Sequence, residues 1–221
     1  MDYLYKASNF TQRMTLGIFA DYKVTGREHV PPDGPLIIVA NHQSNLDPAF
    51  LSPSIPRRIR FLAKNSIFRV PIANWFLRTY GAFPLNRDGV DITAHRWSVA
   101  HIKSGGALAL FPEGTRNPKG MGPAHAGVAR LALSTKTRLL PVGITGTERL
   151  GSVLRVFNPT GRIRMSIGEP FELPLIDGRP SKDELEAITG MIMHRIAAQL
   201  PSEYRGLYSL EEPEGSADGS P

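Results

Sequence analysis

The feature that most constrains the fold is a regular alternation of short apolar runs with segments of helical periodicity. The runs at residues 36–40 and 107–111 contain no polar residue, which is typical of strands buried on both faces of a sheet. Between such runs, apolar residues recur every three or four positions, as they do in amphipathic helices. Strands that alternate with helices predict an α/β fold, with a largely parallel sheet flanked by helices.

The boundaries of these elements can be placed from periodicity and from turn and capping residues. The predicted strands cover residues 22–24, 36–40, 58–63, 82–85, 107–111, 139–144 and 163–167. Two helices carry a start signal: Asp91 can cap one, and Ser181 with Glu184 forms a capping box for another. The predicted helices cover residues 3–19, 68–80 (interrupted around Pro71), 91–103, 128–133 and 181–200.

We expect three parts in the chain. Residues 1–20 form an N-terminal amphipathic helix, and residues 21–205 form one domain around the sheet, since 221 residues fit a single sizeable core. Residues 206–221 form a disordered acidic tail, because the stretch 211–221 has one Ala and no larger apolar residue.

Composition excludes several classes of chemistry. Cysteine is absent, which removes disulfides, thiolate nucleophiles and zinc–sulfur sites, and the histidines show no metal-ligand spacing. We therefore predict neither a metal nor a bound cofactor. No apolar run approaches the ~18 residues needed to span a bilayer, which predicts a soluble or peripheral protein. The formal net charge of +6 permits nucleic acid, anionic lipid or a phosphorylated substrate as partner.

The first candidate site lies at the end of the strand at residues 36–40. His42 and Asp47 follow it, five residues apart at a strand-to-helix junction, so their side chains can fold back into contact. The carboxylate of Asp47 would hold one imidazole nitrogen protonated and leave the other free to accept a proton from a hydroxyl. The alternative is that His42 orders a turn and Asp47 starts the next helix.

Other predicted strands end in charged residues. The strand at residues 107–111 leads into a Pro-Glu-Gly-Thr-Arg segment that ends at Arg116, and Arg87 and Lys64 follow two further strands. Arg is suited to a planar, bidentate grip on phosphate. The carboxyl ends of parallel strands are where ligands usually bind, so we expect these residues near His42. The alternative is a surface turn with a local ion pair and solvated cations.

Together these segments resemble the PlsC-type glycerophosphate and lysophosphatidate acyltransferase family. The Asn-His-x4-Asp block at residues 41–47 and the Phe-Pro-Glu-Gly-Thr-Arg block at residues 111–116 match the family in full. Arg87, at the end of a short strand, matches a second block, and the apolar segment at residues 141–144 matches a fourth. One departure is Ala-His-Ala-Gly at residues 124–127, where relatives often carry an aromatic and a basic residue.

The resemblance implies that a fatty acyl group passes from a thioester, acyl-CoA or acyl carrier protein, to a free hydroxyl of a glycerophosphate acceptor. It implies His42 as general base and Asp47 as the residue that orients it. Lys64 is a further candidate for contact with the phosphate. The substrate-binding residues that the resemblance implies are Arg87, Glu113, Gly114, Thr115 and Arg116.

The acceptor and the reaction class leave alternatives open. The expected acceptor is 1-acylglycerol 3-phosphate, which would give phosphatidic acid for phospholipid synthesis; glycerol 3-phosphate or another lysolipid is the alternative. Neither a Gly-x-Ser-x-Gly elbow nor a Cys occurs, which favours direct attack in a ternary complex. A thioester hydrolase would need no phosphate-binding arginines. A non-catalytic module that binds anionic lipid would not explain His42 with Asp47, and we expect no nucleic-acid partner.

Long-chain products lie in a bilayer, so we expect a cytoplasmic protein, peripheral on the inner face of the cell membrane. The helix at residues 1–20 could lie in the membrane interface or pack against the sheet, and Arg57, Arg58 and Arg60 could meet anionic headgroups. The apolar positions of this helix are Tyr3, Ala7, Phe10, Met14 and Ile18. A second set of apolar residues could either line a tunnel for the acyl chain or pack in the hydrophobic core. We expect these residues to pack in the core. It comprises Phe68, Ile72, Trp75 and Phe76.

Overall fold

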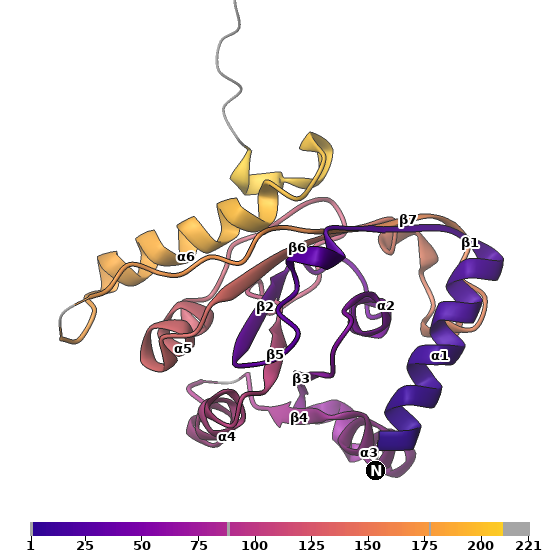
Figure 1. The fold of residues 1–221 in the computed structure, drawn as a ribbon, viewed down its shortest axis with the longest axis horizontal. Helices are drawn as coiled ribbons and strands as arrows, with labels where there is room; N and C mark the ends of the chain where they lie inside the picture. Colours follow the sequence, from indigo (N-terminus) through magenta and orange to yellow (C-terminus); the bar gives the residue numbers. More distant parts are fainter. Residues whose placement is uncertain (1, 88, 177, 210–221) are drawn as a thin grey trace, which may run out of the picture.

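The computed structural model describes residues 2–87, 89–176 and 178–209. Its centre is a seven-stranded sheet in the order β1-β7-β6-β2-β5-β3-β4 (Figure 1). The strands are β1 (Ala20–Thr25), β2 (Leu36–Ala40), β3 (Ile59–Lys64), β4 (Ala82–Leu85), β5 (Ala107–Leu110), β6 (Leu139–Thr145) and β7 (Gly161–Ile167). All neighbours pair in parallel except β6 and β7, which are antiparallel. The predicted α/β fold with a largely parallel sheet is confirmed.

Helices cover both faces of the sheet. In Figure 1, α4, α5 and α6 lie to the left of the sheet, and α1, α2 and α3 lie to the right. The α-helices are α1 (Asp2–Phe19), α2 (Asp47–Ser54), α3 (Pro71–Tyr80), α4 (Ile92–Lys103), α5 (Gly127–Thr135) and α6 (Lys182–Ala197). The 3-10 helices are η1 (Arg27–His29), η2 (Asn65–Arg69), η3 (Glu148–Leu150), η4 (Val153–Val156), η5 (Ser202–Tyr204) and η6 (Gly206–Tyr208).

The central strand β2 separates two hydrophobic cores. Successive side chains of a strand point to opposite faces. Leu36 and Ile38 therefore join the core under α1 and α2, while Ile37 and Val39 join the core under α4, α5 and α6. All four are fully buried, which explains why this run contains no polar residue. The sheet is thus held rigidly from both sides, and its carboxyl edge offers fixed positions for functional side chains.

The helix starts that the sequence predicts are present. Asp91 accepts a hydrogen bond from Ala94 N at 2.9 Å, and Ser181 and Glu184 form the reciprocal capping box at the start of α6. The acidic tail was expected to begin at residue 206. However, η6 is hydrogen-bonded to the domain, because Leu207 N donates to Met121 O at 3.0 Å. The folded part therefore extends at least through η6, and residues 210–221 lie outside the described residues.

The predicted N-terminal helix is confirmed, but it packs through the face opposite to its apolar stripe. Tyr5, Asn9 and Leu16 are buried against the domain. The apolar positions read from the sequence point outward, with Tyr3 88% and Phe10 66% exposed. The remaining outward apolar positions of this helix are Ala7, Met14, Ile18 and Phe19.

The expectation of core packing for the apolar set around α3 is wrong in part. Phe68 is buried, as expected, but Ile72 is 80% and Trp75 62% exposed. The helix α3 packs on α1, where the Tyr80 hydroxyl donates to Asn9 Oδ1 at 2.9 Å, so these exposed side chains lie on a helix that neighbours α1. No helix among residues 2–87, 89–176 and 178–209 has the length and apolarity to cross a bilayer.

Candidate active site

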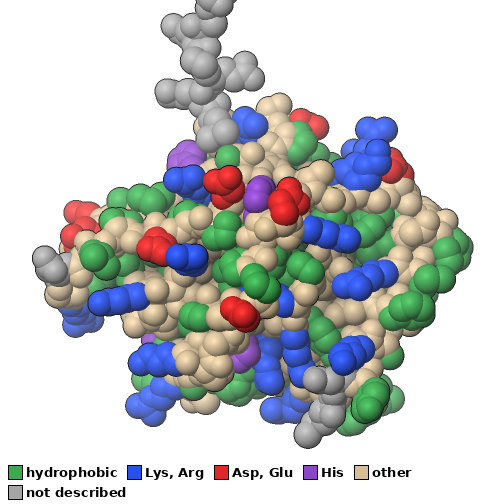
Figure 2. Space-filling view, in the orientation of Figure 1, with side chains coloured by type: hydrophobic (Ala, Val, Ile, Leu, Met, Phe, Trp, Pro, Cys, Tyr) green, Lys and Arg blue, Asp and Glu red, His purple; other side chains and the backbone are tan. Residues whose placement is uncertain are grey.

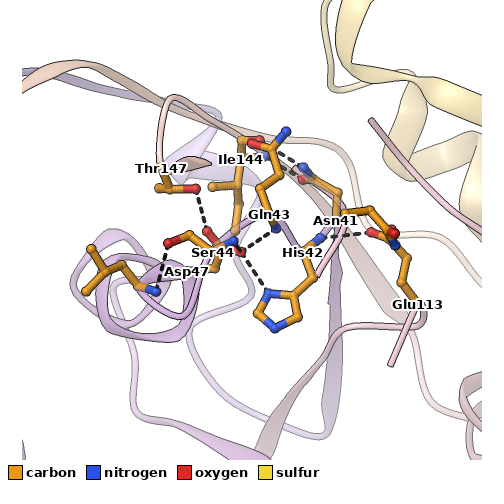
Figure 3. A network of polar contacts seen from close by, with 10 residues as sticks. Asn41, His42, Gln43, Ser44, Asp47, Glu113, Ile144 and Thr147 are labelled. Carbon is orange, nitrogen blue, oxygen red and sulfur yellow. Dashed lines mark hydrogen bonds and ion pairs between the residues drawn. The ribbon is translucent and has the colours of Figure 1, made fainter. Parts of the chain in front are cut away.

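The loop between β2 and α2 brings His42 and Asp47 together. Asp47 opens α2, and its Oδ2 accepts hydrogen bonds from Gln43 N at 2.7 Å and Ser44 N at 2.8 Å, which folds the loop back on itself (Figure 3). The same oxygen lies 2.7 Å from His42 Nδ1. Because an ionised carboxylate can only accept, Nδ1 carries the proton and donates it. The predicted contact between these two side chains is therefore present.

The second ring nitrogen of His42 is available for chemistry. It points away from Asp47 in Figure 3 and makes no hydrogen bond with any residue in the described part of the chain. The ring stacks on Phe111, with 4.3 Å between ring centroids, and its side chain is 11% exposed. Stacking and the bond to Asp47 together fix the plane of the ring, so Nε2 has one direction in which to accept a proton.

Thr147 is a member of the site that sequence reasoning missed. It is fully buried, and its hydroxyl donates to Asp47 Oδ1 at 2.6 Å, the oxygen that the loop leaves open. Thr147 follows β6, which pairs with β2, so the sheet order places it beside the His42 loop. The only sequence feature that points to Thr147 is its position as a hydroxyl residue just after a predicted strand. The sequence does not show that this strand pairs with β2.

Asn41 ties the same two strands together. It is buried, its Nδ2 donates to Ile144 O at 2.9 Å, and its Oδ1 accepts from Ile144 N at 2.8 Å (Figure 3). The Asn41 side chain thus adds two hydrogen bonds at the end of the backbone pairing between β2 and β6. The residue before His42 is thereby fixed to the sheet, and so is the start of the loop.

Glu113 holds the main chain of His42. Its Oε1 accepts from His42 N at 2.9 Å, while its Oε2 accepts from Gly122 N at 2.8 Å and from Asn117 Nδ2. Asn117 N in turn donates to His42 O at 2.7 Å. Burial raises the pKa of the Glu113 carboxyl, and these hydrogen bonds act in the opposite direction. The sequence predicted contact with substrate, whereas this carboxylate is 1% exposed and engaged by three donors of the protein itself.

The predicted cations lie at or after strand ends at the carboxyl edge of the sheet. Arg87 Nη1 donates to Gly114 O, which joins the segment after β4 to the segment after β5. Lys64 ends β3, in register with Leu85 of β4, so it lies on the same side as Arg87. Thr115 and Arg116 are exposed on the adjoining loop. Neither Lys64 nor Arg116 has an ion pair or hydrogen bond with a residue that the structure describes.

The backbone at Gly114 explains the Gly of the third block. Its φ is +65°, and an added Cβ would lie 2.8 Å from His125 Cδ2. A side chain there would be strained and would clash. His125 belongs to the Ala-His-Ala-Gly segment that departs from the family pattern, and its ring lies against the loop that carries Arg116.

No group of three metal-ligating side chains occurs within the described ranges.

Replacing Glu113 with Gln should destabilise the protein by about 1–3 kcal/mol, the usual cost of leaving buried donors unpaired. A Gln amide has one oxygen, so it cannot accept from all three donors, and its NH2 group would face N–H groups. Thermal unfolding compared with the exposed control Glu172→Gln measures this effect. Equal melting temperatures for the two variants would contradict the internal role of Glu113.

Known proteins share this arrangement. A family model described as Acyltransferase matches residues 21–145. The 1-acyl-sn-glycerol-3-phosphate acyltransferase of Bacillus subtilis is 26% identical over 194 residues, which cover 87% of this chain and 95% of that protein. The enzyme of that name from Borreliella burgdorferi is 30% identical over 181 residues, covering 80% of this chain and 70% of that protein. The crystal structure of the 1-acyl-sn-glycerophosphate acyltransferase PlsC from Thermotoga maritima superimposes with a TM-score of 0.67 at 29% identity, covering 86% and 76% of the two chains.

The fold and these relatives define an O-acyltransferase. The family model spans more than half of the chain, and the chain belongs to the acyltransferase family. The resemblance to the PlsC type that its blocks predict is confirmed. The matched segment contains the His42 loop, the Glu113 loop and all of β6, so it includes most of the site.

Proposed function

We propose that this enzyme transfers a fatty acyl group from acyl-CoA or acyl carrier protein to the free hydroxyl of 1-acylglycerol 3-phosphate, forming phosphatidic acid. The observation that carries the proposal is the His42–Asp47 pair, whose Nε2 no described residue engages, at the sheet edge where Lys64 ends β3 and Arg87 and Arg116 follow β4 and β5. The Bacillus subtilis and Borreliella burgdorferi relatives are both named 1-acyl-sn-glycerol-3-phosphate acyltransferase, which supports the same acceptor.

In the proposed mechanism, the acceptor hydroxyl attacks the thioester carbonyl while His42 Nε2 takes its proton. The imidazolium is stabilised by the Asp47 carboxylate, 2.7 Å from Nδ1. When the tetrahedral intermediate collapses, the carbon–sulfur bond breaks and the imidazolium returns its proton to the thiolate. No covalent acyl-enzyme is required, so both substrates must be bound at the same time.

The acceptor's phosphate would be held by the cations of the sheet edge. Arg116 is exposed, Arg87 is anchored through Gly114 O, and both guanidinium groups can donate to phosphate oxygens. Water needs no such contacts, which favours transfer over thioester hydrolysis.

Arg116→Gln should lower kcat/KM for the phosphorylated acceptor by about 10- to 100-fold, the loss expected for one charge-assisted hydrogen bond of roughly 1.5–3 kcal/mol. The same variant should change turnover of an unphosphorylated monoacylglycerol by less than about twofold. Arg130→Gln, an exposed cation on α5, is the matched control. An equal loss on both acceptors would mean that Arg116 supports the loop and does not bind phosphate.

The proposed enzyme would dock on a bilayer through the exposed apolar face of α1 and its neighbours. Figure 2 shows hydrophobic side chains along the right edge, where Figure 1 places α1, with Lys and Arg side chains beside them. The segment at η4 adds to this face, because Thr15 of α1 donates to Val156 O at 3.2 Å and Leu154 is 71% exposed. Apolar residues outside and cations at the flanks are typical of interfacial helices. Acyl-CoA cannot cross a membrane unaided, which favours the cytoplasmic face.

The docking proposal predicts that Phe10→Ser, Met14→Ser and Ile18→Ser combined should weaken binding to liposomes by about tenfold or more, because each side chain would lose part of its ~1.5–3 kcal/mol of burial. These residues are exposed, so the fold should survive. The control replaces three exposed apolar residues outside α1 with Ser. These are Leu175, Met191 and Leu207, and their replacement should leave liposome binding nearly unchanged. The measurement is flotation of both triple variants with lipid vesicles. Equal binding by the two variants would exclude α1 as the anchor.

The acceptor is tested by a panel of acyl thioesters against phosphorylated and unphosphorylated lysolipids. Phosphatidic acid formed from 1-acylglycerol 3-phosphate at the highest kcat/KM is the expected result. Preference for glycerol 3-phosphate or another lysolipid would overturn the proposed acceptor, and rapid thioester loss without any acceptor would indicate a hydrolase.

A further inference from the structure

A cavity of about 310 Å³ lies between α1 and the segment that joins α2 to β3. Its volume is at the low end of the range for small-molecule sites, ~300–1,000 Å³. Residues 55–58 form its floor and precede β3, so the cavity lies at the amino end of that strand. His42 and the acceptor cations lie at the carboxyl edge. The cavity is therefore separate from the proposed catalytic site.

The cavity is strongly basic. Its lining includes Lys6, Arg13, Arg57 and Arg58, and none of the lining residues carries a carboxylate. Arg57 is committed to the protein, because its two terminal nitrogens donate to four carbonyl oxygens of the 31–34 turn and Gly105. Its guanidinium therefore contributes a positive charge at a fixed position in the cavity lining.

Two of the other cations can turn toward a ligand. Arg13 donates through Nε to Pro53 O at 3.0 Å, which anchors the side chain and leaves its two terminal nitrogens without a partner among the described residues. Lys6 has no hydrogen bond or ion pair within the described ranges. Arg58 lies over the Tyr5 ring at 5.2 Å, at the border of the cavity.

An amide whose orientation is fixed also lines the cavity. Asn9 is 8% exposed, and its Oδ1 accepts from the Tyr80 hydroxyl at 2.9 Å. That bond fixes the orientation of the amide, and Nδ2 makes no hydrogen bond with any residue that the structure describes. An N–H group beside three or more cations is suited to an anionic oxygen.

We propose that this cavity binds the phosphate of one anionic phospholipid headgroup, with Lys6, Arg13 and Asn9 Nδ2 as its donors. The inference rests on the proposed docking of α1 on a bilayer. Lys6 and Arg13, seven residues apart, share one flank of α1, between its outward apolar face and its buried face. When the apolar face enters the bilayer, that flank lies at the depth of the headgroups. Phe10 lines the cavity and is also exposed on the apolar face, which makes the site continuous with the lipid-facing surface.

A neighbouring cavity of about 440 Å³ is less suited to the same ligand. It shares Arg57 and Arg58 but is also lined by Asp33, whose carboxylate opposes an anion. His101 Nε2 lies 3.1 Å from Ala107 O, so that nitrogen is already engaged, and burial and the nearby arginines lower the pKa of this imidazole. The anion is therefore assigned to the smaller cavity beside α1.

The probe for the site is dihexanoyl phosphatidylglycerol, used as monomers in water and titrated into the full-length protein. The double variant Lys6→Gln with Arg13→Gln should bind it about tenfold or more weakly, since each cation near an anionic headgroup contributes about a factor of five. The control Lys103→Gln with Arg130→Gln removes the same charge from α4 and α5, on the other side of the sheet, and should bind within about twofold of wild type. Equal losses in both pairs, or no binding by the wild type, would overturn the site.

A second variant tests the Asn9 amide as a donor. Asn9→Asp keeps an oxygen that accepts from the Tyr80 hydroxyl, but its second carboxylate oxygen replaces the Nδ2 donor. The negative charge would repel an anionic headgroup, so binding of the lipid should be lost. Thr11→Asp adds the same charge to an exposed position of α1 outside the cavity and should have a small effect. Wild-type affinity in a folded Asn9→Asp protein would exclude the site.

Two further arms distinguish a lipid headgroup site from a simple phosphate site and from an effect on catalysis. Inorganic phosphate should bind at least about tenfold more weakly than the short-chain lipid, because it lacks the glycerol and chains that would contact Phe10; equal affinity would refute a lipid site. Acyl transfer to a water-soluble short-chain acceptor should be unchanged in all cavity variants. Failure of the headgroup site would then leave the proposed reaction standing, and failure of the reaction would show in the wild type.

Discussion

Replacing His42 with Ala should lower kcat by about 10²–10⁴-fold, the usual contribution of a general base, with little change in the KM of either substrate. The ring is 11% exposed and its Nε2 has no protein partner in the described chain, so its removal affects the acceptor proton more than the fold. The measurement is steady-state transfer with the purified variant, at saturating thioester and 1-acylglycerol 3-phosphate.

The matched control for that experiment is His95→Ala, which removes an exposed imidazole from α4. It should keep wild-type turnover. If a folded His42→Ala protein turned over within a few-fold of the control, His42 would not be the base.

Asp47→Asn should cause a loss of similar size, up to about 10⁴-fold in kcat, while the loop keeps its shape. Three donors converge on Oδ2: His42 Nδ1, Gln43 N and Ser44 N. An Asn would therefore keep its oxygen there and turn its NH2 group to the Thr147 hydroxyl, which can rotate to accept. The substitution removes the negative charge that stabilises the imidazolium and little else.

Two measurements on Asp47→Asn distinguish charge from structure. Its kcat should fall, and its near-ultraviolet circular dichroism should match that of the wild type because the hydrogen bonds of the loop are kept. Full activity in the variant would show that His42 needs no anionic partner. A loss of activity that accompanies a loss of tertiary signal would instead make Asp47 a structural residue.

The positions of the site residues could be predicted because each follows a strand of a parallel sheet. Carboxyl ends of such strands meet at one edge, so His42, Arg87 and the segment at residues 111–116 were expected together, and the structure places them together. The local sequence also carries the His42–Asp47 contact, since five residues suffice to fold the loop back.

Partners distant in sequence could not be predicted. Thr147 meets Asp47 across 100 residues, and only the order of the strands brings β6 beside β2. The antiparallel pairing of β6 with β7 was missed for the same reason, because residue periodicity does not record strand direction. The inward turn of Glu113 depends on donors from two loops: His42 N after β2, and Asn117 Nδ2 and Gly122 N after β5.

The orientation of amphipathic segments was the other gap. Periodicity shows that a helix has an apolar face, but it does not say whether that face meets the core or a lipid surface. In α1 the buried face contains Tyr5 and Asn9, which pair with other polar groups, and the apolar face is left outside. The same holds for Ile72 and Trp75 on α3.

Initial rates, measured while the acyl thioester and 1-acylglycerol 3-phosphate are both varied, test most directly whether the acceptor attacks the thioester while His42 takes its proton. Direct transfer needs both substrates on the enzyme together, so double-reciprocal plots should give intersecting lines. Parallel lines would show that an acyl-enzyme forms before the acceptor binds, and the proposed role of His42 as base for the acceptor hydroxyl in a ternary complex would be contradicted.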